Sequence, residues 1–123
     1  MAGLTPTTPR PTEIKLHQVS GILEVTFSDD RVFQFPCEYL RVFSPSAEVR
    51  GHGPGQEVLQ VGKKDVRIMA VDPVGAYAVK FVFSDGHDTG IYSWDYLHDL
   101  GTRQSDNWST YLKRLAQAGA SRE

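Results

Sequence analysis

The sequence predicts an α+β protein with a mostly antiparallel β-sheet of about six strands, short helices and a C-terminal amphipathic helix. Three observations lead to this prediction. Apolar residues alternate in several short runs, Gly, Asp and Pro separate those runs, and one stretch near the C-terminus repeats its apolar residues at helical spacing. The chain has 123 residues, of which 40% are hydrophobic and 23% charged, as is typical of one soluble globular domain.

The N-terminal residues 1–12 are rich in Thr and Pro and hold almost nothing to bury. We therefore expect a flexible arm there, followed by a single domain over residues 13–119. The domain is expected to start with a β-hairpin, because alternating apolar runs at 14–16 and 23–27 flank the turn-forming pair Ser20–Gly21.

A turn, a third strand and a short helix are expected next. Residues 28–30 read Ser-Asp-Asp, which favours a turn, and residues 31–35 alternate like a strand. Pro36 suits the first position of a helix, where no backbone N–H is needed, so residues 36–42 are predicted to be helical. Cys37 is expected to be a small, half-buried apolar residue at the start of this helix.

The segment 44–64 is predicted to be a long loop, because it holds four Gly, two Pro and few apolar residues. Loops of this length inside a compact domain are usually functional or mobile. Two strands follow within residues 65–83. The expected turn between them is Asp72–Gly75, which places Pro73 at the second turn position, where its fixed φ is favourable.

A strand and two helices complete the prediction. Residues 90–94 form the strand, and Ser93 caps a short helix that ends at Gly101. The last helix follows Ser105–Asp106 and ends at Gly119. Its apolar stripe at helical spacing consists of Trp108, Tyr111, Leu112, Leu115 and Ala116. We expect this stripe to dock on the domain itself rather than on another chain.

Two segments, 25–40 and 81–97, share one order of features: an apolar strand, a Phe-Ser-Asp turn, an aromatic strand and a short helix that ends in Tyr-Leu. The two Tyr-Leu pairs are one residue further apart than the two Phe-Ser-Asp elements. The second copy therefore has one extra residue, within the segment 86–90. Duplication or convergence would both produce such a repeat.

Composition excludes several classes of protein. A net charge of −2, with basic residues scattered among acidic ones, argues against a nucleic-acid-binding protein. The single cysteine excludes an internal disulfide and a multi-cysteine zinc or iron–sulfur site within one chain. No stretch approaches the ~20 apolar residues of a membrane span, and the N-terminus has no apolar leader, so we expect a cytoplasmic protein without membrane association.

The most distinctive short stretch, Asp-Gly-His-Asp-Thr-Gly at 85–90, holds a His between two Asp residues. Its Asp-Gly pair and its second Gly are typical of a hairpin loop. His87 beside two carboxylates is also the pattern of a general base or a metal ligand. In the alternative interpretation, the carboxylates cap the loop backbone and His87 packs on Tyr92 or Trp94.

A second His, His52, lies between Gly residues that would allow close approach of the backbone to a ligand. The alternative is that it is an incidental residue of a mobile loop. If His52 and His87 meet in space, they supply two ligands for iron or zinc. The oxygen ligand would then come from Asp85, Asp88 or Glu48.

Catalysis by a serine triad is poorly supported, because the sequence has no Gly-x-Ser-x-Gly elbow. Arg41 is expected either to bind an anion or to pair with Glu38 or Glu48. His17 and His98 are expected to be solvated.

Three segments carry a resemblance to a known family: Tyr-Leu-Arg-Val-Phe-Ser-Pro-Ser-Ala-Glu at 39–48, Gly-His-Gly-Pro-Gly at 51–55 and Asp-Gly-His-Asp-Thr-Gly-Ile-Tyr-Ser-Trp at 85–94. Together they resemble the bacterial stand-alone proteins known as domain of unknown function 971 (DUF971). This family is also called the γ-butyrobetaine hydroxylase-like N-terminal domain. The resemblance covers residues 10–101, which is most of the chain.

The resemblance implies less about function. In the carnitine-synthesis dioxygenases, a similar domain precedes the catalytic barrel and holds a structural zinc through three Cys and one His. Here the residues after Leu40–Arg41 contain no Cys, and His87 is the one match to that ligand set, so a zinc site of that type is not expected. The sequence has no 2-oxoglutarate barrel, so hydroxylase activity is not expected. Similar domains are also fused to P-loop ATPases with iron–sulfur clusters, which leaves an iron-linked role open by analogy.

The leading hypothesis is a small non-catalytic binding module with an unknown protein partner. Its surface is expected to form from the loops 44–56 and 85–92 and their neighbours: Arg41, Ser44, Ser46, Glu48, His52, Asp85, His87, Asp88, Tyr92 and Trp94. The second hypothesis is a protein that binds iron or zinc through His87 and His52 and is linked to iron–sulfur or metal handling. The third is an enzyme in which His87 acts as base and Asp88 orients it. The sequence leaves the oligomeric state open.

Overall fold

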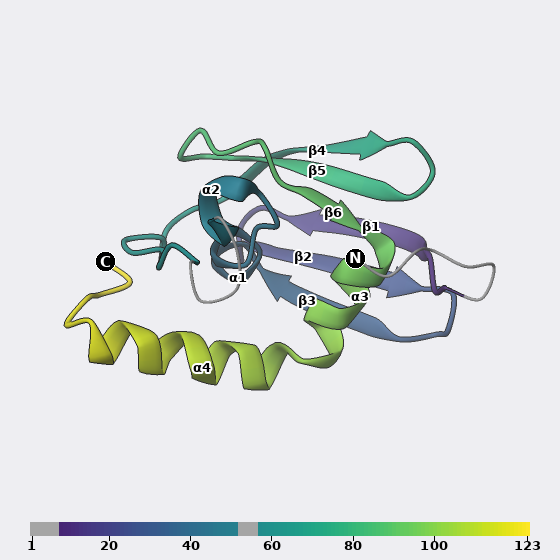
Figure 1. Cartoon of the computed structure of the whole chain (residues 1–123). Helices are drawn as coiled ribbons and strands as arrows, with labels where there is room; N and C mark the ends of the chain where they lie inside the picture. The colour runs from purple at the N-terminus through teal and green to yellow at the C-terminus, as the bar shows by residue number, and fades with distance from the viewer. Residues whose placement is uncertain (1–7, 52–56) are drawn as a thin grey trace.

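The computed structural model describes residues 8–51 and 57–123. This part of the chain has two three-stranded antiparallel sheets and four helices (Figure 1). The first sheet has the order β1 (Pro11–His17), β2 (Ile22–Phe27), β3 (Val32–Pro36), and the second has the order β4 (Ile68–Val74), β5 (Ala78–Phe83), β6 (Ile91–Ser93). The helices are α1 (Cys37–Val42), α2 (Ala47–Arg50), α3 (Trp94–Thr102) and α4 (Gln104–Gln117). The predicted α+β class with its antiparallel strands is confirmed.

The first hairpin forms as predicted. β1 pairs with β2 so that Ile14 lies opposite Val25 and Leu16 opposite Leu23. Leu23 and Val25 are fully buried, and the two β1 side chains pack against the same core. Because side chains alternate between the faces of a sheet, this register places the apolar set on one face.

The last two residues of the N-terminal arm predicted for residues 1–12 lie in β1, which starts at Pro11. Arg10 also exchanges hydrogen bonds with Ser28. The Arg10 N–H donates to Oγ of Ser28 (3.0 Å), and the Ser28 N–H donates to the Arg10 carbonyl (2.8 Å). Residues 1–7 lie outside the described part of the chain.

The turn between β4 and β5 lies later than predicted. The expected turn was Asp72–Gly75, but β4 continues to Val74 and residues 75–77 make the connection. Pro73 pairs with Val79 inside the strand. Because β4 is at the edge of its sheet, Pro73 can be accommodated without a backbone N–H on the open side.

Two helix boundaries also differ from the prediction. Pro36 ends β3, where it pairs with Ile22, and helix α1 starts at the next residue. Helix α3 follows Ser93 as predicted but continues past Gly101. A Cβ at Gly101 would lie 2.5 Å from ring atoms of Phe33, so this Gly allows close packing rather than ending the helix.

The predicted loop 44–64 contains the single-turn helix α2. Ser46 caps it, since its Oγ accepts the Glu48 N–H at 3.2 Å. One helical turn is too short to produce an apolar period, so the sequence pattern did not reveal it. Helix α4 begins at Gln104, which places the predicted cap Ser105–Asp106 within its first turn.

Both sheets contribute apolar side chains to one shared core, and α4 docks on this domain as predicted. Figure 1 shows α4 on the side of the first sheet, away from β4 and β5. Tyr111 and Leu115 are buried against Val42. Leu112 and Ala116 are exposed, so the docking face is narrower than the predicted stripe. None of the described helices is long and apolar enough to cross a membrane.

Gly119 is the predicted limit of the domain, but the residues after it pack against the rest of the protein. The Gly62 N–H donates to the Ser121 carbonyl (3.1 Å). The Arg122 guanidinium donates to both carboxylate oxygens of buried Glu38, at 2.6 and 2.8 Å. A bidentate pair of this kind ties the C-terminal segment to α1.

The predicted internal repeat is present in the backbone. In the turn after β2, the Phe27 N–H donates to the Arg31 carbonyl (2.8 Å), and in the turn after β5 the Phe83 N–H donates to the His87 carbonyl (2.9 Å). Each unit therefore has the order strand, strand, turn, strand, helix, helix. Helices α1 and α2 of the first unit correspond to α3 and α4 of the second.

The strand register confirms the extra residue of the second unit. Glu24 pairs with Gln34, and the equivalent Lys80 pairs with Ile91. Counted along the chain from the Phe-Ser-Asp turn of its own unit, Ile91 comes one residue later than Gln34 does. The extra residue therefore falls within residues 88–90, inside the predicted segment.

The helices of the two units exchange equivalent contacts. The Tyr39 hydroxyl of α1 donates to the Leu100 carbonyl of α3 (2.6 Å), and the Tyr96 hydroxyl of α3 donates to the Phe43 carbonyl after α1 (2.5 Å). Such reciprocity relates the two units by an approximate twofold axis.

Charged contacts follow the same reciprocity. Arg41 of α1 donates to Asp85 in the second turn (2.9 Å), and His98 of α3 contacts Asp29 in the first turn (2.8 Å). Two expectations are corrected here. Arg41 pairs with neither of the acids that its sequence neighbourhood suggested, and His98 is largely enclosed rather than solvated. His17 is exposed, as expected.

Candidate functional site

The turn after β5 directs His87 into the protein. The Asp85 Oδ1 accepts the His87 N–H at 3.2 Å, which is the backbone capping expected of this carboxylate. The His87 side chain is 3% exposed. Its ring packs on Phe83, with centroids 6.0 Å apart, in place of the expected Tyr92 or Trp94.

Both ring nitrogens of His87 have partners in residues 44–48, which lead from the end of α1 into α2. Nε2 lies 2.8 Å from Oγ of Ser44, and Nδ1 lies 3.1 Å from Oε2 of Glu48. Ser44 is buried, whereas the Glu48 side chain is 65% exposed. The result is a chain Ser44–His87–Glu48 that runs from the interior to the surface.

The surroundings hold His87 in its neutral form. Burial and the nearby Arg41 guanidinium lower the pKa of His87, and they outweigh the hydrogen bond to Glu48 that raises it. A carboxylate accepts hydrogen bonds, so we assign the proton to Nδ1, facing Glu48. Nε2 then accepts a hydrogen bond from the Ser44 hydroxyl.

Asp85 is the acceptor of a second cluster beside His87. Its Oδ2 accepts from Nε of Arg41 (2.9 Å) and from Nζ of Lys63 (2.7 Å). Partial burial alone would raise the pKa of Asp85, but the hydrogen bonds from Lys63, the His87 N–H and Arg41 lower it to about 2. Asp85 is therefore ionised at all physiological pH values.

Arg41 places a positive charge in the interior. Its side chain is 8% exposed, and Nη1 is buried without a hydrogen-bond partner in the described part of the chain. A buried cation with an incomplete set of acceptors depends strongly on its one carboxylate partner. Asp85 is thus essential to the placement of Arg41.

The loop after His87 is closely packed on the segment after α1. A Cβ at Gly90 would lie 2.3 Å from Oγ of Ser44, so no larger residue fits without movement. Oγ of Ser46 and Oγ1 of Thr89 are hydrogen-bonded at 2.7 Å. The Ser46 N–H also donates to Oγ of Ser44 (3.3 Å). The residues 44–48 and 85–90 therefore form one rigid unit, which we call the polar lock.

The order Ser44–His87–Glu48 is that of a nucleophile, a base and an orienting acid. A catalytic nucleophile must contact its substrate, however, and Ser44 is 1% exposed and covered by Gly90. The acid that contacts the imidazole is Glu48; Asp88, the residue expected to orient the base, is exposed. The geometry suits a structural role for this chain better than catalysis.

Nine of the ten predicted surface residues lie in the described part of the chain, and the structure distributes these nine between interior and exterior. Five of them are buried: Arg41, Ser44, Ser46, His87 and Tyr92. Tyr92 donates its hydroxyl hydrogen bond to the Leu40 carbonyl, and Trp94 donates from Nε1 to the Ala76 carbonyl. These residues support the surface from beneath, while Glu48 and Asp88 face outward.

Thr89 of the lock, and Lys63, which contacts the lock through Asp85, were not among the predicted site residues. Thr89 lies within the distinctive loop, so its hydroxyl could have been considered. Lys63 lies 22 residues from Asp85 and has no distinguishing pattern around it.

The metal hypothesis is not tested by this arrangement. His52 lies outside the described residues, so its distance from His87 stays undefined. Among the residues with described positions, no group of three or more His, Cys, Asp or Glu side chains could hold a metal ion. A metal at His87 would have to displace either Ser44 or Glu48 from its ring.

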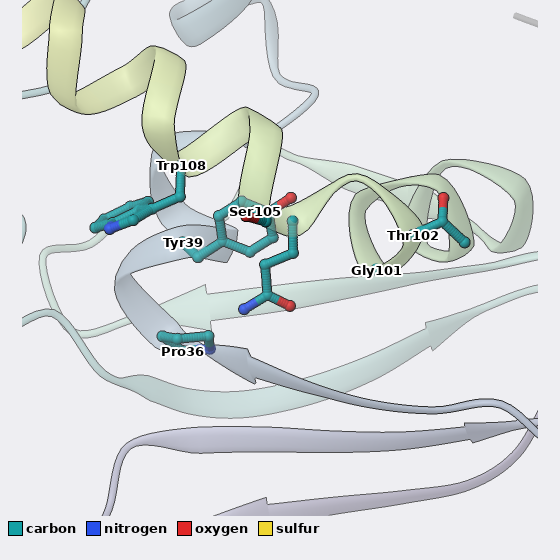
Figure 2. A pocket seen from close by; sticks show the side chains of 7 residues that line it. Pro36, Tyr39, Gly101, Thr102, Ser105 and Trp108 are labelled. Carbon is teal, nitrogen blue, oxygen red and sulfur yellow. The ribbon is translucent and has the colours of Figure 1, made fainter.

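A pocket of about 490 Å³ lies apart from the polar lock, at the junction of α1, α3 and α4 (Figure 2). Its lining consists of Pro36, Tyr39, Gly101, Thr102, Gln104, Ser105 and Trp108. The rings of Tyr39 and Trp108 meet edge to face, with centroids 6.2 Å apart. No charged side chain is among these described lining residues, which distinguishes this pocket from the surroundings of His87.

Comparison with solved structures gives extensive similarity. One solution structure is 54% identical, with a TM-score of 0.81 over 98% of this chain and 92% of the other. A second is 47% identical, with a TM-score of 0.82 over 94% and 91% of the two chains. A crystal structure of a protein of unknown function from Acidithiobacillus ferrooxidans, of the DUF971 family, is 38% identical, with a TM-score of 0.63 over 75% and 92%.

No curated protein of assigned function matches the chain. The sequence profile described as gamma-butyrobetaine hydroxylase-like, N-terminal, matches residues 14–98, which include most of β1, all other strands, α1, α2 and the polar lock. The chain therefore belongs to the gamma-butyrobetaine hydroxylase-like N-terminal family, in agreement with the resemblance seen in its motifs.

Proposed function

We propose that this protein is a small non-catalytic binding module that recognises a protein partner through the surface above the polar lock. The observation that carries the proposal is the internal pairing of the reactive groups. His87, Ser44 and Arg41 are buried, and their polar contacts run to neighbouring protein groups. Such a network rigidifies two loops rather than presenting a reaction centre.

A rigid pair of loops favours binding, because little conformational freedom is lost when a partner docks. The segments 44–51 and 85–92 come from opposite units of the repeat, and the lock fixes them side by side. Recognition surfaces are often carried by loops held on a rigid scaffold.

The exposed residues on these segments suggest the chemistry of the partner. Glu48 and Asp88 are exposed carboxylates, and Ile91 is a 50% exposed apolar side chain on β6. A partner that carries a basic residue next to an apolar one would complement this surface. The two acids would steer association, and Ile91 would supply buried apolar area.

Quantitative affinity enrichment from cells that express the protein tests the proposal. The bait would be compared with Ile91→Arg and with the matched control Val19→Arg, since Val19 is 99% exposed in the β1–β2 turn. We expect a protein that is enriched by the native bait and by Val19→Arg and lost with Ile91→Arg. Direct binding of that purified protein by calorimetry should then weaken for Asp88→Lys. Equal recovery with all three baits would contradict the proposal.

The metal-binding alternative stays a prediction, and no contact in the described part of the chain favours it. Its iron–sulfur or metal-handling role, the cytoplasmic location and the absence of nucleic-acid or membrane partners likewise stay expectations from the sequence.

A further inference from the structure

A second pocket, of about 440 Å³, lies where all four helices approach one another. Val42 of α1, Val49 of α2, Tyr96 of α3 and Tyr111 of α4 each line it, and Val58 closes one side. This volume lies within the range of small-molecule sites, about 300–1,000 Å³. The apolar lining would accommodate the body of a small organic ligand.

The wall of this pocket is held in place by hydrogen bonds. The Tyr96 hydroxyl donates to the Phe43 carbonyl (2.5 Å), and the Tyr111 hydroxyl donates to the Gln60 carbonyl (2.7 Å). Both tyrosines therefore present their rings to the pocket while their hydroxyls are already satisfied. Such a wall is formed before a ligand arrives.

Two guanidinium groups also line the pocket. Arg50 lies over the Tyr96 ring, 4.8 Å from its centroid, and Arg114 makes a long hydrogen bond to the Glu57 carbonyl (3.4 Å). Neither arginine forms an ion pair with a carboxylate in the described part of the chain. Arginines without a carboxylate partner at an apolar pocket are suited to bind a ligand carboxylate through paired N–H donors.

The net charge of the side chains that line the pocket favours a carboxylate over a phosphate. The lining carries two positive side chains, Arg50 and Arg114, and one negative side chain, Glu57. This leaves one positive charge in excess, which matches a singly charged carboxylate better than a doubly charged phosphate. Thr110 lines the same pocket.

We infer that the pocket between the four helices binds a small organic monocarboxylate, with its apolar body against Val49, Val58 and Tyr111 and its carboxylate between Arg50 and Arg114. The exposed residues proposed above to contact a protein partner, Glu48, Asp88 and Ile91, do not line this pocket, although Ser44 and Arg50 of the neighbouring segment do. Either inference can therefore fail without the other. The pocket in Figure 2, which has aromatic rings but no described charge, serves as an internal comparison.

The test is a titration followed by two-dimensional ¹H–¹⁵N NMR, with hexanoate as the probe and hexanamide as its neutral analogue. We expect saturable shifts at Val49, Val58 and Thr110 with hexanoate, and affinity at least about tenfold weaker for hexanamide. Arg114→Gln should weaken hexanoate by about tenfold, because it removes one charged donor pair. Arg103→Gln, a matched control in the exposed residue before α4, should leave binding unchanged.

Three outcomes would overturn the inference. These are the absence of saturable shifts, equal binding of hexanoate and hexanamide, and shifts centred on Trp108 and Gly101 of the Figure 2 pocket. The comparison of the two probes uses the native protein alone, so it decides the question even if Arg114→Gln is unstable.

Discussion

The two units of the repeat use different residues at equivalent packing positions. In the first unit the Phe33 ring packs against Gly101 of α3, where a Cβ would approach to 2.5 Å. At the equivalent place in the second unit the roles are exchanged. Gly90 replaces the aromatic residue, and Ser44 after α1 supplies the side chain, with its Oγ 2.3 Å from the position of a Cβ.

The charged positions differ in the same way. His98 packs edge-on against Phe27 and Phe33 and contacts Asp29, so the first turn is closed by aromatic rings. Arg41 occupies the equivalent position facing the second turn, where it is buried with an unsatisfied Nη1.

Apolar packing stabilises a fold without polar groups that need partners. A buried polar network, in contrast, lowers the stability of the fold if any of its members is missing. The second turn also has the extra residue, within residues 88–90, where Gly90 packs against Ser44. Departures from simple packing tend to mark functional regions. The comparison therefore directs attention to the polar lock rather than to its apolar counterpart.

The largest expected effect comes from filling the space between the two segments of the lock. Gly90→Ala should lower the free energy of unfolding by about 3 kcal/mol, because its Cβ would overlap Oγ of Ser44. The double variant Gly90→Ala/Ser44→Ala should recover part of this loss, since the overlapping atom is gone. Chemical denaturation of the four members of this cycle measures the coupling. Additive losses would show that the two residues do not meet.

A smaller effect separates the Arg41–Asp85 pair of the second turn from the His98–Asp29 pair of the first. Asp85→Asn should lower the free energy of unfolding by about 2 kcal/mol, because Arg41 loses its carboxylate while its burial persists. Asp29→Asn is the matched control in the other unit and should cost less, because its partner His98 also has aromatic contacts. Equal losses in denaturant titrations would contradict the difference drawn between the two turns.

The lock should also make stability depend on pH. Burial lowers the pKa of His87 below its ordinary 6.5, so the unfolded chain binds more protons and stability is lost as pH falls below that value. Asp85, with its pKa lowered from 3.8 to about 2, adds a further loss as pH falls between these values. Unfolding measured from pH 7 to pH 5 should show a shallower slope for His87→Gln than for the native protein.

The smallest expected effect is that of added metal. Both His87 nitrogens are hydrogen-bonded, so equimolar Zn²⁺ or Fe²⁺ should leave the His87 imidazole resonances unshifted. NMR of the imidazole protons, with metal analysis of the purified protein, checks this expectation. Stoichiometric binding that shifts both His87 and His52 would place the two in one site and restore the metal hypothesis.

Local patterns were sufficient for much of this fold. Alternation around Leu23 and Val25 identified the first hairpin, helical spacing of Tyr111 and Leu115 identified α4, and the two Phe-Ser-Asp segments revealed the repeat and its extra residue. These features depend on neighbours within a few residues, and such interactions are readable from a single sequence. The motifs at 39–48, 51–55 and 85–94 together were likewise enough to identify the family.

The tertiary structure decided what the same residues contact. Gly101 looks like the end of a helix, but its role is to let the Phe33 ring pack closely. Pro73 looks like a turn residue, but it is paired with Val79 in an edge strand. The contact of Ser44 with His87 spans 43 residues, and that of Arg41 with Asp85 spans 44. Contacts over such separations arise from the approximate twofold packing of the two units. In this packing α1 of the first unit contacts the turn after β5, and α3 of the second unit contacts the turn after β2. No local pattern encodes that arrangement, so the sequence alone could suggest candidate residues but not which of them would be buried together.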